Sequence, residues 1–208
     1  MEEHEATASE ESKAGEGSTW MVPRPPERLT GHERFIGMDK SVLDFWCWAF
    51  SDLRENITRG ILAEYLVAKA AGDERDLRIG WDNFDVRAAD GTTIEVKCSA
   101  FLQSWPQRNH SRLNFARLRA RSWNPDSNEF SLDKQVRADV FVFAVQIQRA
   151  PDQYDMLDLA HWKFWVISGT IIREQGGTSV GIDWVKRHAS GPFDHQRLAA
   201  AIREAAQS

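Results

Sequence analysis

The chain has 208 residues, of which 42% are apolar and 11% aromatic, and this is enough to bury the core of a single domain. Its formal net charge is −5, but seven acids and three bases fall within residues 1–30, so the rest of the chain is close to neutral. This balance neither favours nor excludes a nucleic-acid partner, because local patches set the field that a ligand meets.

The cysteines and histidines argue against two classes of protein. Cys47 and Cys98 lie in apolar patterns, and the six histidines lack zinc-hydrolase spacing, so a disulfide scaffold and a zinc enzyme are not expected. No apolar run reaches the roughly 20 residues that span a bilayer, and the acidic N-terminus does not resemble a secretory signal. We therefore expect a cytoplasmic protein without membrane contact.

The chain is expected to begin with a tail. Residues 1–30 are rich in Glu, Ser, Gly and Pro and cannot bury enough apolar surface to offset the entropy of ordering. We predict a disordered tail over residues 1–30 and a single domain over residues 31–208.

Two helices are predicted next. Apolar residues recur at helical spacing over residues 38–54, which indicates an amphipathic helix that packs on another element. A second helix is expected over residues 58–71, because Asn56 or Thr58 caps its start and Gly72 its end.

Glu64 occupies an unusual position on the second helix. Its neighbours on the same face are small or apolar, namely Gly60, Ile61, Val67 and Ala68. A carboxylate on such a stripe needs a partner, because burying an unpaired charge is costly. Either a structural salt bridge or a role in a site shared with the segment downstream satisfies that need.

That segment, residues 83–99, predicts a β-hairpin. Because side chains alternate faces along a strand, Glu95 and Lys97 share one face and the apolar residues around them take the other. A three-residue loop over residues 90–92 places Asp85 opposite Lys97 on that polar face. A two-residue loop sends Asp85 to the other side, so its position depends on the register.

An arginine-rich stretch follows the hairpin. From Cys98 to Pro125 there is no acid, and the bases are Arg108, Arg112, Arg117, Arg119 and Arg121. Alternation around Leu113 and Phe115 predicts a strand, with a helix as the alternative. Arginines interleaved with aromatic residues can grip phosphates and stack on bases, whereas the other interpretation is a solvated strand face.

The remaining elements complete an α/β pattern. Residues 138–147 predict a central strand buried on both faces, and residues 162–167 and 180–185 predict two more strands. A final amphipathic helix is expected after Asp194. The fold class is therefore α/β, with a central mixed sheet flanked by helices.

The hairpin residues suit metal-dependent chemistry. Asp85 and Glu95 offer two carboxylates on adjacent strands, a hard oxygen site fitted to Mg²⁺ or Mn²⁺, and the backbone carbonyl of Val96 would complete the coordination. A cation there neutralises a phosphate and lowers the pKa of a bound water. Lys97 would orient that water or stabilise the developing negative charge.

The order of these residues resembles the PD-(D/E)XK nuclease superfamily, also called restriction-endonuclease-like. Glu64 lies on a helix, Asp85 follows it, and Glu95-Val96-Lys97 lies on a strand. The resemblance covers residues 60–147 and implies an α-β-β-β-α-β core. Phe84 stands where the namesake motif has proline, and the helix between the third and last core strands is not plain in the sequence.

The resemblance also implies the roles of individual residues. Asp85 and Glu95 match the metal ligands, Lys97 the catalytic lysine and Glu64 an accessory acid. Gln103 falls where several branches carry a glutamine that organises the site or the substrate. Superfamily members that cut both DNA strands often act as homodimers.

Three hypotheses remain from the sequence. The favoured one is a Mg²⁺-dependent or Mn²⁺-dependent endonuclease that hydrolyses DNA. The second keeps the fold without the activity, as a module that binds nucleic acid or another protein. The third is a surface ion pair on an unrelated α/β protein, which needs no metal. The form of the nucleic acid, the sequence specificity, the pathway and the oligomeric state stay open.

Overall fold

The computed structural model describes residues 24–208 except for 76, 81, 122 and 125–128. Most of the predicted tail, residues 1–23, lies outside this range, and residues 24–30 are exposed and belong to no helix or strand. Within the described part, no helix combines the length and the apolar character needed to cross a lipid bilayer.

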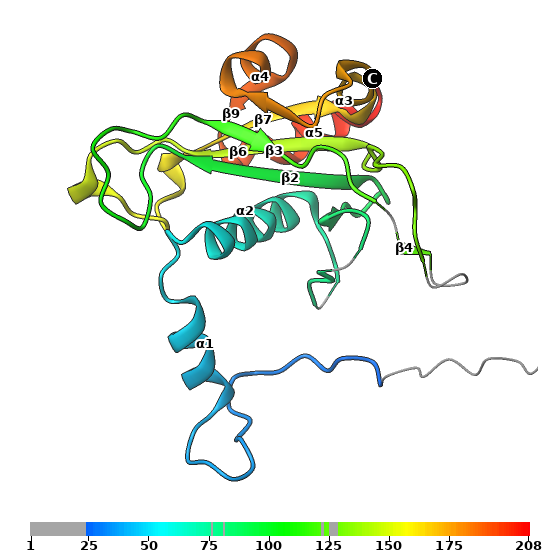
Figure 1. Ribbon diagram of the computed structural model, residues 1–208. Coiled ribbons are helices and arrows are strands. Elements are labelled where there is room, and N and C mark those ends of the chain that lie inside the picture. Colours follow the sequence, from blue (N-terminus) through cyan, green and yellow to red (C-terminus); the bar gives the residue numbers. More distant parts are fainter. Residues whose placement is uncertain (1–23, 76, 81, 122, 125–128) are drawn as a thin grey trace, which may run out of the picture.

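A five-stranded mixed sheet forms the centre of the molecule (Figure 1). In spatial order its strands are β1 (Val86–Arg87), β2 (Thr93–Ala100), β6 (Val140–Gln146), β7 (Trp162–Ser168) and β9 (Ser190–Phe193). Strands β2 and β6 are parallel, and the other neighbours are antiparallel. The predicted hairpin, buried central strand and following strand are confirmed, and so is an α/β fold with a mixed sheet.

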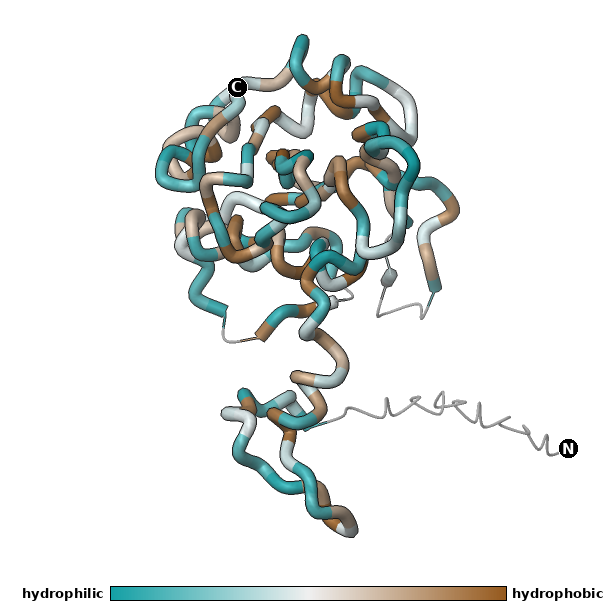
Figure 2. Tube along the Cα trace, turned by 90° about the vertical axis from the view of Figure 1, so that its left-hand side faces the viewer, coloured by the Kyte–Doolittle hydropathy of each residue, from teal (hydrophilic) through white to brown (hydrophobic). Residues whose placement is uncertain are grey.

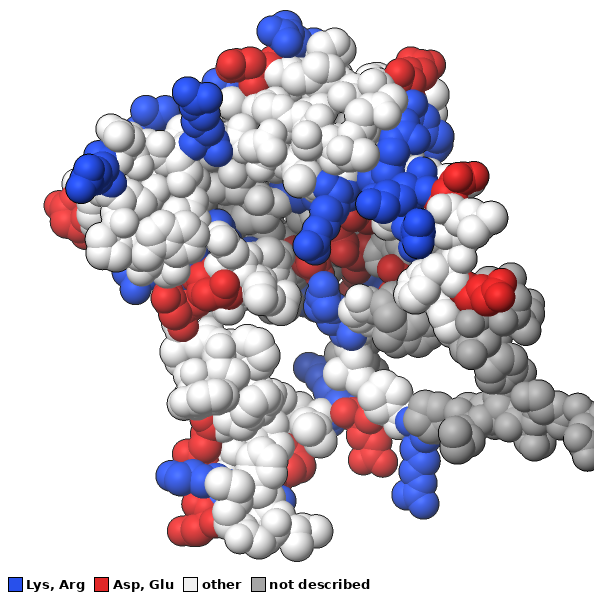
Figure 3. Space-filling view, viewed as in Figure 1, with Lys and Arg blue, Asp and Glu red and all other residues white. Residues whose placement is uncertain are grey.

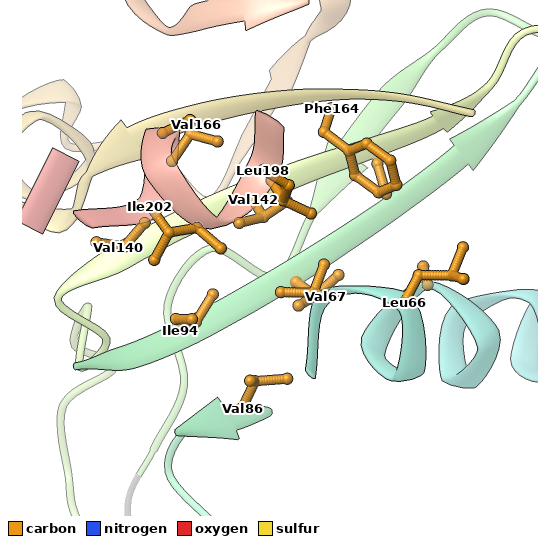
Figure 4. Packing of buried hydrophobic residues seen from close by; sticks show 14 of the residues in the cluster. Leu66, Val67, Val86, Ile94, Val140, Val142, Phe164, Val166, Leu198 and Ile202 are labelled. Carbon is orange, nitrogen blue, oxygen red and sulfur yellow. The ribbon is translucent and has the colours of Figure 1, made fainter. Parts of the chain in front are cut away.

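One face of the sheet is covered by two helices, α2 (Asn56–Ala71) and α5 (His195–Ala206). Figure 4 shows their apolar side chains meeting those of β1, β2, β6 and β7, including Leu66, Val67, Ile94, Val142, Phe164, Leu198 and Ile202. Helix α2 starts two residues earlier than predicted, with Glu55 as its N-cap, and ends at Gly72 in the left-handed conformation as expected.

The opposite face is covered by smaller elements. These are β3 (Asn114–Ala116) and β8 (Ser179–Gly181), which pair with each other, and the helices α3 (Gly169–Gln175) and α4 (Ile182–His188). Their buried residues pack on the phenylalanines of β6, and the rings of Phe115 and Phe143 lie 4.8 Å apart. The remaining elements are β4 (Trp123–Asn124), β5 (Glu129–Phe130), and the 3-10 turns η1 (Pro151–Gln153) and η2 (Leu159–His161).

The predicted strand over residues 180–185 is largely wrong. Only β8 is extended, and helix α4 begins at Ile182. Ile182 and Val185 are three residues apart on the inner face, which fits a helix as well as a strand. Asp183 in the first turn and three basic residues in the last turn complement the helix dipole, and this decides for the helix.

Helix α1 (Val42–Phe50) is shorter than the predicted range of residues 38–54. Ser41 and Asp44 form a capping box at its start. The sequence predicts that this helix packs on another element, but it has no buried residue and stands apart from the sheet and its helices (Figures 1 and 2).

Candidate metal centre

The hairpin turn sets the register of the charged residues. Its loop comprises residues 89–91, closed by hydrogen bonds between Ala88 and Thr92 and between Gly91 and Ala88, each 2.9 Å long. Val86 pairs with Ile94 and Arg87 with Thr93, so the ladder brings Asp85 beside Glu95. The expected loop over residues 90–92, which would place Asp85 opposite Lys97, is therefore wrong by one residue. Because the loop still has three residues, Asp85 stays on the same face of the sheet as Glu95 and Lys97.

Asp85 directly precedes β1, at the end of its pairing with β2. Its carboxylate accepts a hydrogen bond of 2.8 Å from the backbone N–H of Val96, and its backbone N–H donates to the carbonyl of Ile94. The Asp85 side chain thus takes the place of a backbone carbonyl as the acceptor for the N–H of Val96. This fixes the carboxylate against the edge of β2.

The pKa of Asp85 is raised to about 7. Burial is the largest cause, followed by the negative charges of Glu95 and Glu64, whereas the N–H of Val96 and the charge of Lys97 act in the opposite direction. The negative charges of Glu64 and Glu95 therefore both repel the ionised form of Asp85. A bound cation would relieve this repulsion.

Glu95 and Lys97 lie together, as alternation along the strand predicts. Lys97 Nζ is 2.5 Å from Glu95 Oε1, and both side chains are about four-fifths buried. Across the parallel ladder their neighbours are Phe141 and Phe143 of the buried strand β6. The ion pair is thus held beside an apolar surface from which water is largely excluded.

Glu64 has the partner that its apolar surroundings require. Its carboxylate pairs with the guanidinium of Arg78, with one hydrogen bond from Nη2 to Oε1 of 3.0 Å. Both residues line a cavity of about 270 Å³ that also contains Asp85. Arg78 lies in a loop without periodicity, fourteen residues from Glu64, so no signal in the sequence pointed to it.

A second arginine anchors the loop before the hairpin. Arg75 forms an ion pair with Asp73 at 2.6 Å and donates to the backbone carbonyl of Asp85 at 2.9 Å. Burial tends to raise the pKa of Asp73, but hydrogen bonds from Arg75 and from the N–H of Arg87 hold it below its usual value. Asp73 is thus a structural acid that supports the backbone at Asp85.

The donor set suits a hard cation in part. Among the described residues, no three Asp, Glu, His or Cys side chains are grouped closely enough to hold a metal by themselves. Mg²⁺ commonly binds one or two carboxylates and completes its shell with water and substrate phosphate. Asp85 and Glu95 fit that arrangement, because a cation would offset the negative charges of Glu95 and Glu64 that act on Asp85. The role of the Val96 carbonyl stays a prediction.

Gln103 is held among structural partners. It accepts a hydrogen bond of 3.1 Å from the buried Arg59 and donates to the carbonyl of Ala100 and the hydroxyl of Ser111, each also at 3.1 Å. These contacts tie the loop after β2 to helix α2. A role at the reaction centre stays a prediction.

The five predicted nucleic-acid-binding arginines differ in their surroundings. Arg117, which has a φ of 58°, lines a recess with Glu95, and Arg108 lines a separate cavity of about 310 Å³ beside His110. Arg119 donates to the carbonyls of Gly177 and Arg173 at the end of α3. Arg112 and Arg121 are exposed.

The surface around the site is mixed in charge. Figure 3 shows acidic side chains within a hollow, with Lys and Arg side chains on either side of it. A polyanion approaching such a hollow would meet bases at the rim and acids at the centre. Acidic side chains at the centre repel a phosphate unless a counter-ion offsets their charge.

No protein-family model matches the chain, and no curated protein matches it.

Proposed function

We propose that the protein is a metal-dependent nuclease that hydrolyses DNA phosphodiester bonds, with Asp85 and Glu95 as ligands of Mg²⁺ or Mn²⁺. The observation that carries the proposal is the position of Asp85, directly before β1, beside Glu95 on β2, where the charge of Glu95 acts on it, with Lys97 paired to Glu95 at 2.5 Å. Glu64, across the cavity of about 270 Å³, adds a third negative charge that acts on Asp85.

Each side chain has a role in this proposal. When bound, the divalent ion supplies a Lewis acid and a water of lowered pKa. Lys97 would orient the attacking water or stabilise the negative charge that develops on the phosphate. Arg78 balances Glu64 in the metal-free protein and, at 44% exposure of its side chain, can turn to a phosphate.

We also propose that α2, β1, β2 and β6 form a restriction-endonuclease-like core. The hairpin after a helix that carries Glu64, and a buried strand parallel to the one that carries Lys97, support this assignment. The expected third strand corresponds to β3, which pairs with β8 outside the main sheet. The described residues between β2 and β6 contain no helix, in contrast to the expected core.

A second candidate is a nuclease-fold module without activity that binds nucleic acid or a protein. One observation favours it: Glu64 and Glu95 each already have a basic partner, Arg78 and Lys97. In such a module these pairs would be permanent, and divalent ions would not displace them.

A nuclease assay separates the two candidates. Linear, nicked, single-stranded and branched DNA are incubated with Mn²⁺ and the wild type, Lys97→Ala, or the control Lys163→Ala, whose lysine lies on β7 and pairs with Asp194. The proposal expects cleavage by the wild type and the control, and a loss of about 100-fold or more in Lys97→Ala. Intact DNA in every reaction would overturn it.

Calorimetry tests the metal centre without reference to activity. Mn²⁺ titrated into the wild type should release heat with saturation, and titration into Asp85→Ala should not. The control Asp152→Ala removes an exposed acid on η1 and should behave as the wild type. Equal heats for Asp85→Ala and the wild type would remove Asp85 from the ligand set.

A further inference from the structure

Residues 24–50 are called the N-terminal arm; Arg28 lines the cavity beside Glu64, whereas the part from Gly31 onward folds on itself rather than on the sheet. Residues 31–41 form a hairpin-like turn with a bridge between Arg34 and Ser41, and the N–H of Leu43 donates to the carbonyl of Gly31 at 2.9 Å. Gly31 contacts the ring of Trp46, where an added Cβ would lie 3.2 Å from a ring carbon. The arm therefore has a defined shape of its own.

The arm presents large apolar side chains to solvent. Ile36 is fully exposed, Trp48 is 85% exposed, and Phe35, Met38, Leu43, Phe45 and Phe50 are each at least two-fifths exposed. Helix α1 has only nine residues, none buried. Isolated helices shorter than about 12–15 residues are marginal in water, so α1 requires a partner for its apolar side.

The extent of this surface matches a protein interface. An aromatic side chain of this kind buries roughly 150–250 Å² when it is covered. Seven side chains at the observed exposures thus offer several hundred Å², comparable with the roughly 800 Å² per partner of a standard interface. Surfaces of this kind on single chains usually mark interaction sites.

The charges of the arm indicate which partner fits. Residues 24–50 carry four bases and four acids, and Arg34 pairs with Asp39 and Lys40 with Asp44. DNA would require an excess of bases, and a strongly charged protein would require an excess of the opposite sign. A surface without net charge can face an identical copy of itself without repulsion.

The N-terminal residues outside the described part are a poor match for this surface. Residues 1–23 contain six acids and one base, and their large apolar residues besides the initial Met are Trp20, Met21 and Val22. Three such side chains cannot cover seven. A second copy of the chain therefore fits the arm best, because it offers an apolar surface of equal size and carries no net charge there.

We propose that the N-terminal arm joins two copies of the chain, with α1 of one copy packed against α1 of the other about a two-fold axis. Such an interface is isologous, because each copy presents the same patch. Phe45 and Trp48, three residues apart on one face of α1, form its centre, and the turn that carries Ile36 extends it. The inference does not depend on the proposed nuclease activity.

Sedimentation equilibrium of the full chain tests the proposal. We expect a dimer at micromolar concentration and, for Trp48→Glu, a dissociation constant raised at least about tenfold, because central aromatic residues carry much of the binding energy. Ile36→Glu provides a second variant outside the helix. The control Leu132→Glu changes a side chain that is 90% exposed away from the arm and should leave the dimer intact.

Cys47 on α1 is exposed and serves as a natural probe of the interface. In a Cys98→Ala background, a bismaleimide with a reach of about 10 Å, matching the spacing of packed helices, should join two chains. Trp48→Glu should abolish this product, with circular dichroism confirming that the variant is folded. A wild type that remains monomeric at about 100 µM would overturn the proposal. So would a dimer that persists unchanged in both Trp48→Glu and Ile36→Glu.

Discussion

Strands β2 and β6 are parallel neighbours in the sheet, yet they are built for different purposes. Every residue of β6 is buried, whereas β2 alternates between apolar residues on one face and Glu95 and Lys97 on the other. Glu95 pairs with Phe141 and Lys97 with Phe143 across the ladder. The comparison indicates that β6 supplies a rigid, dry wall against which β2 holds its charges.

The largest expected effect lies on the apolar strand. Phe143 is fully buried and packs on Phe115, so Phe143→Ala should lower the free energy of unfolding by about 3–5 kcal/mol. Urea denaturation measures this. Phe130→Ala, which removes a ring that is 61% exposed on β5, is the matched control and should cost less than about 1 kcal/mol. Equal losses in the two variants would contradict the role of β6 as the rigid, buried wall of the sheet.

In the charged hairpin, by contrast, a substitution should raise the free energy of unfolding. The residue is Asp85, whose ionised carboxylate is less stable in the folded chain than in the unfolded chain. The pKa of Asp85 is about 7 in the folded chain and about 3.9 when unfolded, so its favourable contribution is complete below pH 4 and is lost as the pH rises through 7. Asp85→Asn keeps an acceptor for the N–H of Val96 and avoids this loss.

We therefore expect Asp85→Asn to be more stable than the wild type above pH 7, by on the order of 4 kcal/mol, with the difference vanishing near pH 4. Thermal unfolding with a chelator present at pH 4, 6 and 8 measures the difference. Asp152→Asn, at an exposed acid, should follow the wild type at every pH. A pH-independent difference for Asp85→Asn would show that desolvation does not act on this carboxylate as proposed.

A smaller effect is expected at the pair of Glu64 and Arg78. Arg78 competes with a divalent ion for the acidic side of the cavity, so Arg78→Gln should lower the dissociation constant for Mn²⁺ about three- to tenfold, or on the order of 1 kcal/mol. Calorimetry measures it, with Arg187→Gln on α4 as the control. Weaker metal binding in Arg78→Gln would instead make Arg78 a structural support of Glu64.

The smallest effect concerns two arginines that look alike in the sequence. Arg117 is exposed beside Glu95, whereas Arg119 donates to two backbone carbonyls at the end of α3. Arg117→Ala should reduce the salt slope of DNA binding by about one, and Arg119→Ala should leave it unchanged. Fluorescence anisotropy at several salt concentrations gives the slopes. An equal change in both would return Arg119 to the DNA-binding surface.

The spacing of apolar residues predicts a helix or strand correctly where the pattern fits only one of the two. Alternation in β2, the continuous apolar run of β6 and the left-handed glycine after α2 each correspond to one structure. Residues 182–185 were mistaken for a strand because apolar residues three apart fit both periods over so short a stretch. The packing of α1 could not be inferred, because an amphipathic pattern does not say what covers the apolar face.

Two features of the site follow from the sequence alone: Glu95 and Lys97 share a face because of the period of a strand, and Glu64 needs a partner because its neighbours are apolar. The identity of that partner, Arg78, and the pairing of Asp85 with Glu95 rather than Lys97 come from the folded chain. The reason is physical: alternation is local, whereas loop length and the approach of distant segments depend on the packing of the whole chain.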